Sequence, residues 1–321
     1  MTSSSASSAS AAAAAVGASE HQQQQQQQQQ HQKRPPPAVA SSSSGGGGGA
    51  KSGKGGGSGL GVGPGGGISP SDALYTFDPS RLSALRSAAP WKSDPRYFKS
   101  VSVSPTAAMK MLTHCHSGVE KGLKKGGNPI EVMGLMLGRP EDAEGSRSLV
   151  VTDAFPLPIE GFETRVIADD EDVVNHMIKL TESMERTRRE KVMGWYHSHP
   201  FDVTTHSHCF LSQTDVTTQL QWQRMEDPHG NPFLAVVVDP LRSLAKSEPV
   251  MKAFRVYPPE YSSPIRDECP DGAIVREEQT RLEMWGSCWN RYHELEVRYH
   301  MSDAARTVMS VLTKNFLWMR T

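Results

Sequence analysis

The chain has 321 residues, and its 34 lysines and arginines nearly balance 35 aspartates and glutamates, giving a formal net charge of −1 at pH 7. This balance provides no overall field that would draw the protein to nucleic acid or to an anionic membrane, so we expect neither as a partner. No apolar run is long enough for a membrane-spanning helix, no secretory signal is visible, and the four cysteines form no CxxC pair. We therefore expect a soluble protein of the cytoplasm and nucleus with reduced thiols.

The N-terminal region, residues 1–71, consists mainly of serine, alanine, glutamine and glycine. It includes the glutamine run Gln22–Gln30 and the glycine-rich stretch Gly45–Gly67. Such a composition lacks the apolar side chains that offset the entropy lost on ordering a chain, which predicts a disordered tail. The rest of the chain is long enough for one α/β domain of roughly 150 to 180 residues with an extension.

The first half of this region alternates helical and strand patterns. Ser104–Gly118 has apolar residues at helical spacing behind a Ser-Pro start, which predicts a helix. Ile130–Arg139 and Ser148–Pro158 are apolar runs bounded by glycine and proline, typical of buried strands. Ala168–Lys191 carries acidic residues at its start, arginines at its end and one apolar stripe, so it predicts an amphipathic helix.

The second half continues the alternation and then becomes polar. We predict a strand at Lys191–Pro200, a helix from Ser212 and a strand at Asn231–Pro240. These elements place one domain at residues 72–258, followed at 259–321 by a linker and a C-terminal helical docking region. An apolar face near the end supports docking: Val308, Val311, Leu312 and Phe316. The alternative is that the last helices only cover the sheet of the same domain.

Three histidine pairs with one residue between them are candidates for binding a metal. His197 and His199 end a predicted strand, where residues two apart point to the same side and can converge on one ion. His206 and His208 lie in a polar segment with no strand pattern before it. The third pair lies on the first predicted helix, where residues two apart diverge by about 200°, so it is set aside.

Other residues complete a candidate catalytic site around the first pair. A catalytic zinc ion needs three protein ligands and an open position for water, and Asp215 in the first turn of a helix is the natural third ligand. Glu131, at the start of a buried run, is the candidate general base, and Ser212 is a candidate donor to an oxyanion. A Cys209 thiolate would close the water position, so we expect that cysteine to be buried and structural.

Together these residues resemble the JAMM (MPN-plus) metalloprotease family, whose pattern is an upstream Glu followed by His-x-His-Pro and Ser-x-x-Asp. The resemblance covers residues 74–319 and includes EVMGLMLG, LPIEGFETRV, GWYHSHP and YHELEVRY. It implies an α/β fold, the MPN (JAMM, cytidine-deaminase-like) domain, with a central mixed sheet flanked by helices and a C-terminal helical extension. It also implies one zinc ion held by His197, His199 and Asp215, with Glu131 as acid–base and Ser212 supporting the oxyanion.

Within the family, the segments LPIEGFETRV and YHELEVRY resemble the branch found in the COP-nine signalosome. That likeness implies an isopeptidase that removes the ubiquitin-like Nedd modifier from cullins. It implies as partners Nedd-modified cullins and other signalosome subunits, including a sister MPN subunit. Two alternatives are a deubiquitinase like that of the proteasome lid and a non-catalytic MPN scaffold or transcription cofactor.

The sequence departs from the family pattern in two insertions. The stretch between His199 and Ser212 is longer than usual because of extra residues at Phe201–His208. At the usual spacing the serine would be Ser207, but the residue three further on is then phenylalanine, which cannot bind zinc. The other insertion, Val119–Gly127, is basic and is predicted to loop outward.

One further hypothesis concerns Arg165, which lies in what resembles the family's flap beside the active site. In the free subunit its guanidinium would pair with Asp215 and compete with the metal.

Overall fold

A computed structural model describes residues 69–76, 78–142, 145–157, 161–162, 165–166, 171–188, 190–201 and 207–315. The predicted disordered tail lies outside these residues except for its last three positions. The glutamine and glycine runs therefore stay a prediction.

A curved, closed sheet organises the described part of the chain, in the strand order β1-β3-β2-β6-β7-β8-β9. The strands are β1 (Ser100–Val103), β2 (Met133–Glu141), β3 (Ser148–Pro156), β6 (Lys191–Ser198), β7 (Leu234–Val238), β8 (Met251–Val256) and β9 (Tyr292–Tyr299). Strand β6 is antiparallel to β2 and parallel to β7. The predicted mixed sheet is confirmed, and β6 lies inside it with a partner on each side.

Helix α4 (Pro105–Lys124) covers one face of this sheet. Ser104 caps the helix by accepting the N–H of Ala107 at 3.1 Å, with Pro105 in the first turn as predicted. Its buried residues Ala107, Met111 and Cys115 pack with β-strand side chains in one apolar cluster. The helix runs on to Lys124, so the prediction that Val119–Gly127 loops outward is wrong for most of that insertion. Val119 is buried and continues the apolar face, which explains why helix is favoured there.

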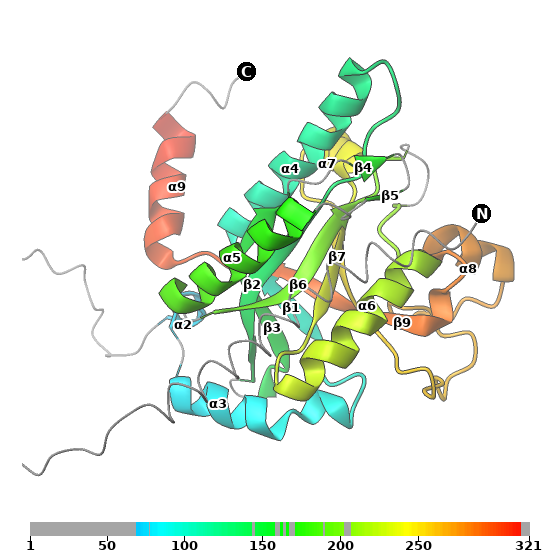
Figure 1. Cartoon of the computed structure of the whole chain (residues 1–321), viewed down its shortest axis with the longest axis horizontal. Coiled ribbons are helices and arrows are strands. Elements are labelled where there is room, and N and C mark those ends of the chain that lie inside the picture. Colours follow the sequence, from blue (N-terminus) through cyan, green and yellow to red (C-terminus); the bar gives the residue numbers. More distant parts are fainter. Residues whose placement is uncertain are drawn as a thin grey trace, which may run out of the picture.

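The opposite face is covered by α6 (Gln213–Glu226) and α8 (Glu278–Trp285), and Figure 1 shows α4 and α6 on opposite sides of the strands. Trp222 of α6 stacks on Phe233 with ring centroids 4.6 Å apart. Trp285 of α8 joins the same cluster. Helix α5 (Glu171–Arg188), predicted from its stripe, places Met184 against this cluster too.

The remaining elements complete the described chain. They are α2 (Pro70–Ala73), α3 (Pro79–Ala88), η1 (Pro90–Lys92), β4 (Gly161–Phe162), β5 (Arg165–Val166), η3 (Asp227–His229), α7 (Pro240–Lys246), η4 (Trp289–Arg291) and α9 (Asp303–Asn315). No helix among the described residues is both long and apolar enough to cross a bilayer.

The sheet does not end at residue 258, where the sequence placed the domain boundary. Strand β9 pairs with β8 and, in parallel, with β1, so it closes the sheet. The segment 259–299 is therefore not a linker followed by helices alone, because its strand is needed to pair β1 on its open edge. Beyond β9, helix α9 projects away from the sheet (Figure 1) with Val308, Met309 and Val311 exposed. Phe316, expected on the same face, lies outside the described residues.

A buried histidine on β9 makes the stability of this sheet depend on pH. The ring of His293 stacks on Tyr257 at 5.1 Å, and neither ring nitrogen has a hydrogen-bond partner among the described residues. Burial, with the nearby positive charges of Arg255 and Arg96, lowers the pKa of His293 to about 3. The folded protein therefore keeps this ring neutral at pH values where the unfolded chain protonates it.

We predict that His293→Phe reduces the acid sensitivity of folding. Below the unfolded-state pKa of about 6.5, only the unfolded wild type takes up this proton, so folding loses about 1.4 kcal/mol per pH unit, or about 2 kcal/mol by about pH 5. The measurement is the free energy of unfolding in urea for both proteins between about pH 7.5 and about pH 5. Parallel pH dependences for the two proteins would contradict the prediction.

Candidate metal centre

The end of β6 places two histidines on the same side of the sheet. His197 pairs with Met133 of β2 and with Val237 of β7, so its backbone is fixed on both sides. His199 lies just beyond the strand, and its N–H still donates to the carbonyl of Val238 at 2.9 Å. The two rings therefore point in the same direction, as the spacing of two predicts. Both are only 3% exposed.

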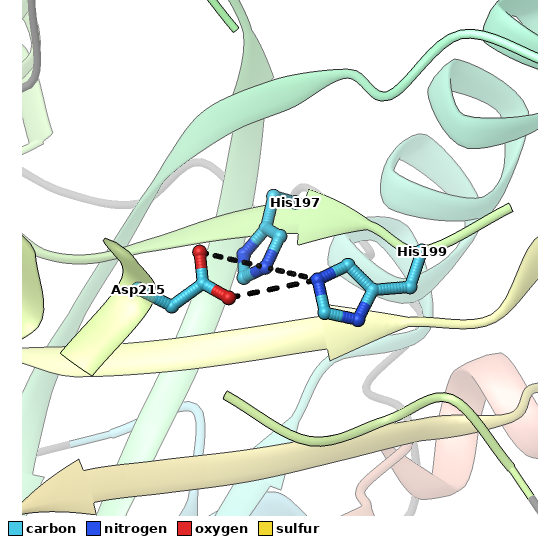
Figure 2. A group of neighbouring side chains, drawn as sticks. All are labelled: His197, His199 and Asp215. Atoms are coloured by element: carbon cyan, nitrogen blue, oxygen red, sulfur yellow. Dashed lines mark hydrogen bonds and ion pairs between the residues drawn. The ribbon is translucent and has the colours of Figure 1, made fainter. Parts of the chain in front are cut away.

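Asp215 approaches the two rings from the start of α6 (Figure 2). It lies at the third helical position and forms a capping box with Ser212: the Ser212 N–H donates to Asp215 Oδ2 at 2.8 Å, and the Asp215 N–H donates to Ser212 Oγ at 3.2 Å. This reciprocal pair fixes both the helix start and the carboxylate. The predicted helix start at Ser212 is confirmed.

The three side chains meet at a distance suited to one ion. The Nε2 atoms of His197 and His199 lie 3.0 Å apart, and the Asp215 oxygens lie 3.4 Å from His197 Nε2 and 3.6 Å from His199 Nε2. A tetrahedral ion with bonds of about 2.0–2.1 Å holds its ligand atoms roughly 3.3 Å apart. The same three residues form the one group of potential metal ligands found among the described residues. The geometry therefore fits a divalent metal.

Hydrogen bonds orient the ligand rings from behind. His199 Nδ1 donates to the carbonyl of His208 at 2.7 Å, which directs the other ring nitrogen, Nε2, toward Asp215. The ring of His197 stacks on Trp195 with centroids 4.5 Å apart and planes 12° apart. Trp195 in turn donates from Nε1 to Gln219 Oε1 at 2.9 Å. The ligands are thus held in place by contacts from β6, α6 and the loop that follows β6.

Sequence reasoning missed the supporting pair Trp195 and Gln219. Both could have been found from spacing, because Trp195 lies two residues before His197 on the same side of a strand. Gln219 lies one turn after Asp215 on the same helix face, where a fully buried amide needs a partner.

The electrostatics of the centre favour a positive charge between the ligands. Burial would raise the pKa of Asp215, but the two histidines hold it well below its usual value. Burial lowers the pKa of His197, whereas for His199 the neighbouring carboxylates outweigh burial and raise the pKa. One imidazolium is therefore favoured in this pocket without metal, and a metal ion would take the place of that proton.

Glu131 lies next to this centre, in the segment just before β2. Its side chain is 8% exposed, and burial raises the pKa of its carboxyl to about 8, with opposite contributions from His199 and Asp215. The sequence placed Glu131 at the opening of a strand, and the structure starts β2 two residues later, at Met133. A buried carboxyl that titrates near neutrality beside a metal site is suited to proton transfer.

Among the described residues, no other candidate contributes a side-chain atom to this group. His208 contributes its backbone carbonyl, and its ring lies near Phe201 and Phe210 instead, with centroids 5.3 Å and 6.4 Å away. Cys209 is buried, as expected, and burial raises the pKa of its thiol to about 12, so it stays protonated. His206, most of the insertion before Ser207 and the side chain of Arg165 lie outside the described part of the chain.

The residues of this centre lie within the part of the chain that matches a known protein family. A family model described as "JAB1/Mov34/MPN/PAD-1 ubiquitin protease" matches residues 96–228. The COP9 signalosome complex subunit 5 of Aspergillus fumigatus is 37% identical over 252 residues, covering 78% of this chain and 67% of the relative. The subunit 5 of Drosophila melanogaster is 35% identical, covering 78% and 68%, and subunit 5b of Arabidopsis thaliana is 36% identical, covering 79% and 63%. The chain thus spans about two thirds of the length of these relatives.

We predict that Asp215→Asn releases the metal and that His208→Ala does not. Asparagine keeps the size and the capping acceptor but loses the anionic oxygen, so metal affinity should fall by more than about 100-fold, since losing even an outer partner costs about 10–100-fold. His208→Ala is the matched control because the ring of that residue is outside the group of potential ligands, and the carbonyl that accepts from His199 is kept. The measurement is metal content by mass spectrometry after dialysis. Equal metal loss in both variants would mean that the inserted histidines supply ligands.

Proposed function

Since the chain belongs to the JAB1/Mov34/MPN/PAD-1 family of ubiquitin proteases, we propose that it is a zinc-dependent isopeptidase that removes the ubiquitin-like Nedd modifier from cullins. The observation that carries the proposal is the buried group of two histidines and one aspartate, with a buried glutamate of raised pKa beside it. The subunit 5 names of the relatives supply the context, a signalosome complex.

Zinc is the ion that the donor set supports best. Two imidazoles and one carboxylate are a common ligand set of catalytic zinc sites, which keep a fourth position for water or substrate. When bound, zinc lowers the pKa of water and polarises the carbonyl of the scissile bond. His197, His199 and Asp215 would hold it, and the two neutral rings with one anionic oxygen leave the centre net positive.

Glu131 is the proposed general base and acid. Its carboxylate takes a proton from the attacking water and then returns it to the leaving amine of the cullin lysine. Burial supports this double role because it raises the pKa of the carboxyl toward neutrality, where both protonation states are accessible.

Ser212 is the proposed donor to the carbonyl oxygen of the scissile bond. Its Oγ accepts the N–H of Asp215, and its own O–H proton remains to donate to the negative charge that develops on that oxygen. The same residue therefore orients a ligand and stabilises the transition state, so removing its hydroxyl affects both.

The proposed partners are Nedd-modified cullins and other signalosome subunits, among them a sister MPN subunit, and the proposed location is the cytoplasm and nucleus. The exposed apolar residues of α9 support assembly, since Val308 is 56% and Val311 is 50% exposed. A non-catalytic scaffold has no need of a complete ligand set with a buried glutamate, which favours the enzyme. A deubiquitinase would use the same centre, so only the substrate distinguishes it.

The test is cleavage of Nedd-modified cullin by the assembled complex, with ubiquitin dimers as the competing substrate. We expect release of the Nedd modifier, its loss on Asp215→Asn and much slower cleavage of ubiquitin dimers. Preferential cleavage of ubiquitin dimers would support the deubiquitinase. If the complex keeps its activity with Asp215→Asn, the activity belongs to another subunit and this chain is a scaffold.

We predict that kcat/KM rises with pH across the titration of Glu131. The base must be ionised, and burial raises its pKa above the usual 4.5, to about 8 without metal, while a bound dication lowers it again. The acid limb should therefore fall between these two values. The measurement is a pH profile of the wild type and of Glu131→Gln, whose residual activity should lack that limb. An unchanged limb in Glu131→Gln would assign it to another group.

A further inference from the structure

The segment that carries Glu131 precedes β2, so the sheet hydrogen bonds of that strand do not hold it in place. We propose that Ser198, the residue between the two histidine ligands, is a positioning residue that fixes Glu131 relative to the metal. The inference rests on the proposed function, in which Glu131 transfers the proton.

Two hydrogen bonds connect Ser198 to the residue after Glu131. The Ser198 N–H donates to the carbonyl of Val132 at 3.0 Å, and the Val132 N–H donates to Ser198 Oγ at 3.0 Å. In a regular antiparallel pair the second bond would go to a backbone carbonyl. Here the serine hydroxyl replaces that carbonyl at the point where β2 and β6 stop pairing, next to the pair Met133 and His197.

Helix α4 closes the same segment from the other side. A Cβ at Gly118 would lie 2.5 Å from the Ile130 carbonyl oxygen and 2.7 Å from Val132 Cγ1, so only glycine allows this approach. The Ile130 N–H donates to the Gly118 carbonyl at 3.3 Å. Ser198 is 0% exposed and lies close enough to the buried thiol of Cys115 on α4 to influence its pKa. The segment is therefore held between α4 and β6, and on the β6 side the Ser198 hydroxyl accepts its Val132 N–H.

The metal ligands themselves do not depend on the Ser198 hydroxyl. The backbone of His197 is paired with β7 and that of His199 bonds to Val238, while Asp215 is fixed by its capping box. Proton transfer, in contrast, requires the base within about 2.6–3.2 Å of its partner. Loss of the hydroxyl should therefore displace Glu131 while the metal stays bound.

The test compares Ser198→Ala and Ser198→Thr in the assembled complex. We expect Ser198→Ala to keep its zinc and its KM but to lose about tenfold to 100-fold in kcat, since a misplacement near 1 Å costs about that much. Ser198→Thr keeps the hydroxyl, so its kcat should stay close to that of the wild type. Ser243→Ala is the matched control: the buried Ser243 also accepts a backbone N–H at its Oγ, that of the partly buried Val250 at 2.9 Å, but this bond lies between α7 and the loop before β8.

A double variant separates positioning from a general loss of structure. If Ser198 acts through Glu131, Ser198→Ala should cause no further loss in a Glu131→Gln background. An additive loss, an equal effect of Ser243→Ala, or loss of zinc in Ser198→Ala would overturn the proposal.

A readout without activity distinguishes this proposal from the proposed function. In the metal-free protein, amide hydrogen exchange of the peptide around residues 130–133 should become faster in Ser198→Ala than in wild type, and remain unchanged in Ser243→Ala. Unchanged exchange in Ser198→Ala would refute the support of Glu131 by this serine. Absence of cleavage by wild type would refute the proposed function alone.

Discussion

A carboxylate buried between two imidazoles is the interaction on which the rest of this site depends. Asp215 is 9% exposed, and an ionised group at such a depth is costly unless opposite charge and hydrogen bonds compensate for the lost water. His197 and His199 provide that compensation at 3.4 Å and 3.6 Å, and they hold the pKa of Asp215 low. A cation placed between the three side chains would balance the negative charge of Asp215. The stability of the pocket is then expected to depend on whether a proton or a metal ion supplies that positive charge.

Three separate elements must meet for this to happen. β6 supplies His197 and, just beyond its end, His199, because an extended chain turns alternate residues to one side, and the two neighbouring strands fix the register of β6 in the sheet. α6 supplies Asp215 because its capping box fixes the first helical turn. Tyr292 of β9 then joins two parts of the surroundings, accepting the N–H of Leu211 at 3.3 Å and donating to the Trp285 carbonyl at 2.6 Å. Residues beyond 258 thus belong to the domain that builds the site.

Much of this was predictable from local patterns, and the failures have a common cause. The helix start at Ser212 and the convergence of the two histidines follow from residue type and spacing alone. The closing strand β9 falls in the stretch that the sequence assigned to a helical docking region, because pairing with β1 is a contact between distant segments that no local pattern contains. The helical path through Val119 and the fixing of Glu131 by Ser198 likewise depend on packing between α4 and the strands. Sequence patterns therefore predicted the three side chains that the structure brings together, whereas the contacts that support them required the structure.

The two carboxyl groups of the site illustrate how surroundings assign roles to identical chemistry. Asp215 and Glu131 are both buried, yet the pKa of one is held low and that of the other is raised to about 8. The difference arises because Asp215 contacts both histidines, while burial dominates at Glu131. A permanently ionised carboxylate suits a ligand, and one that titrates near neutrality suits proton transfer. The depth at which the 130–132 segment holds Glu131 therefore sets the raised pKa on which its proposed role as base depends.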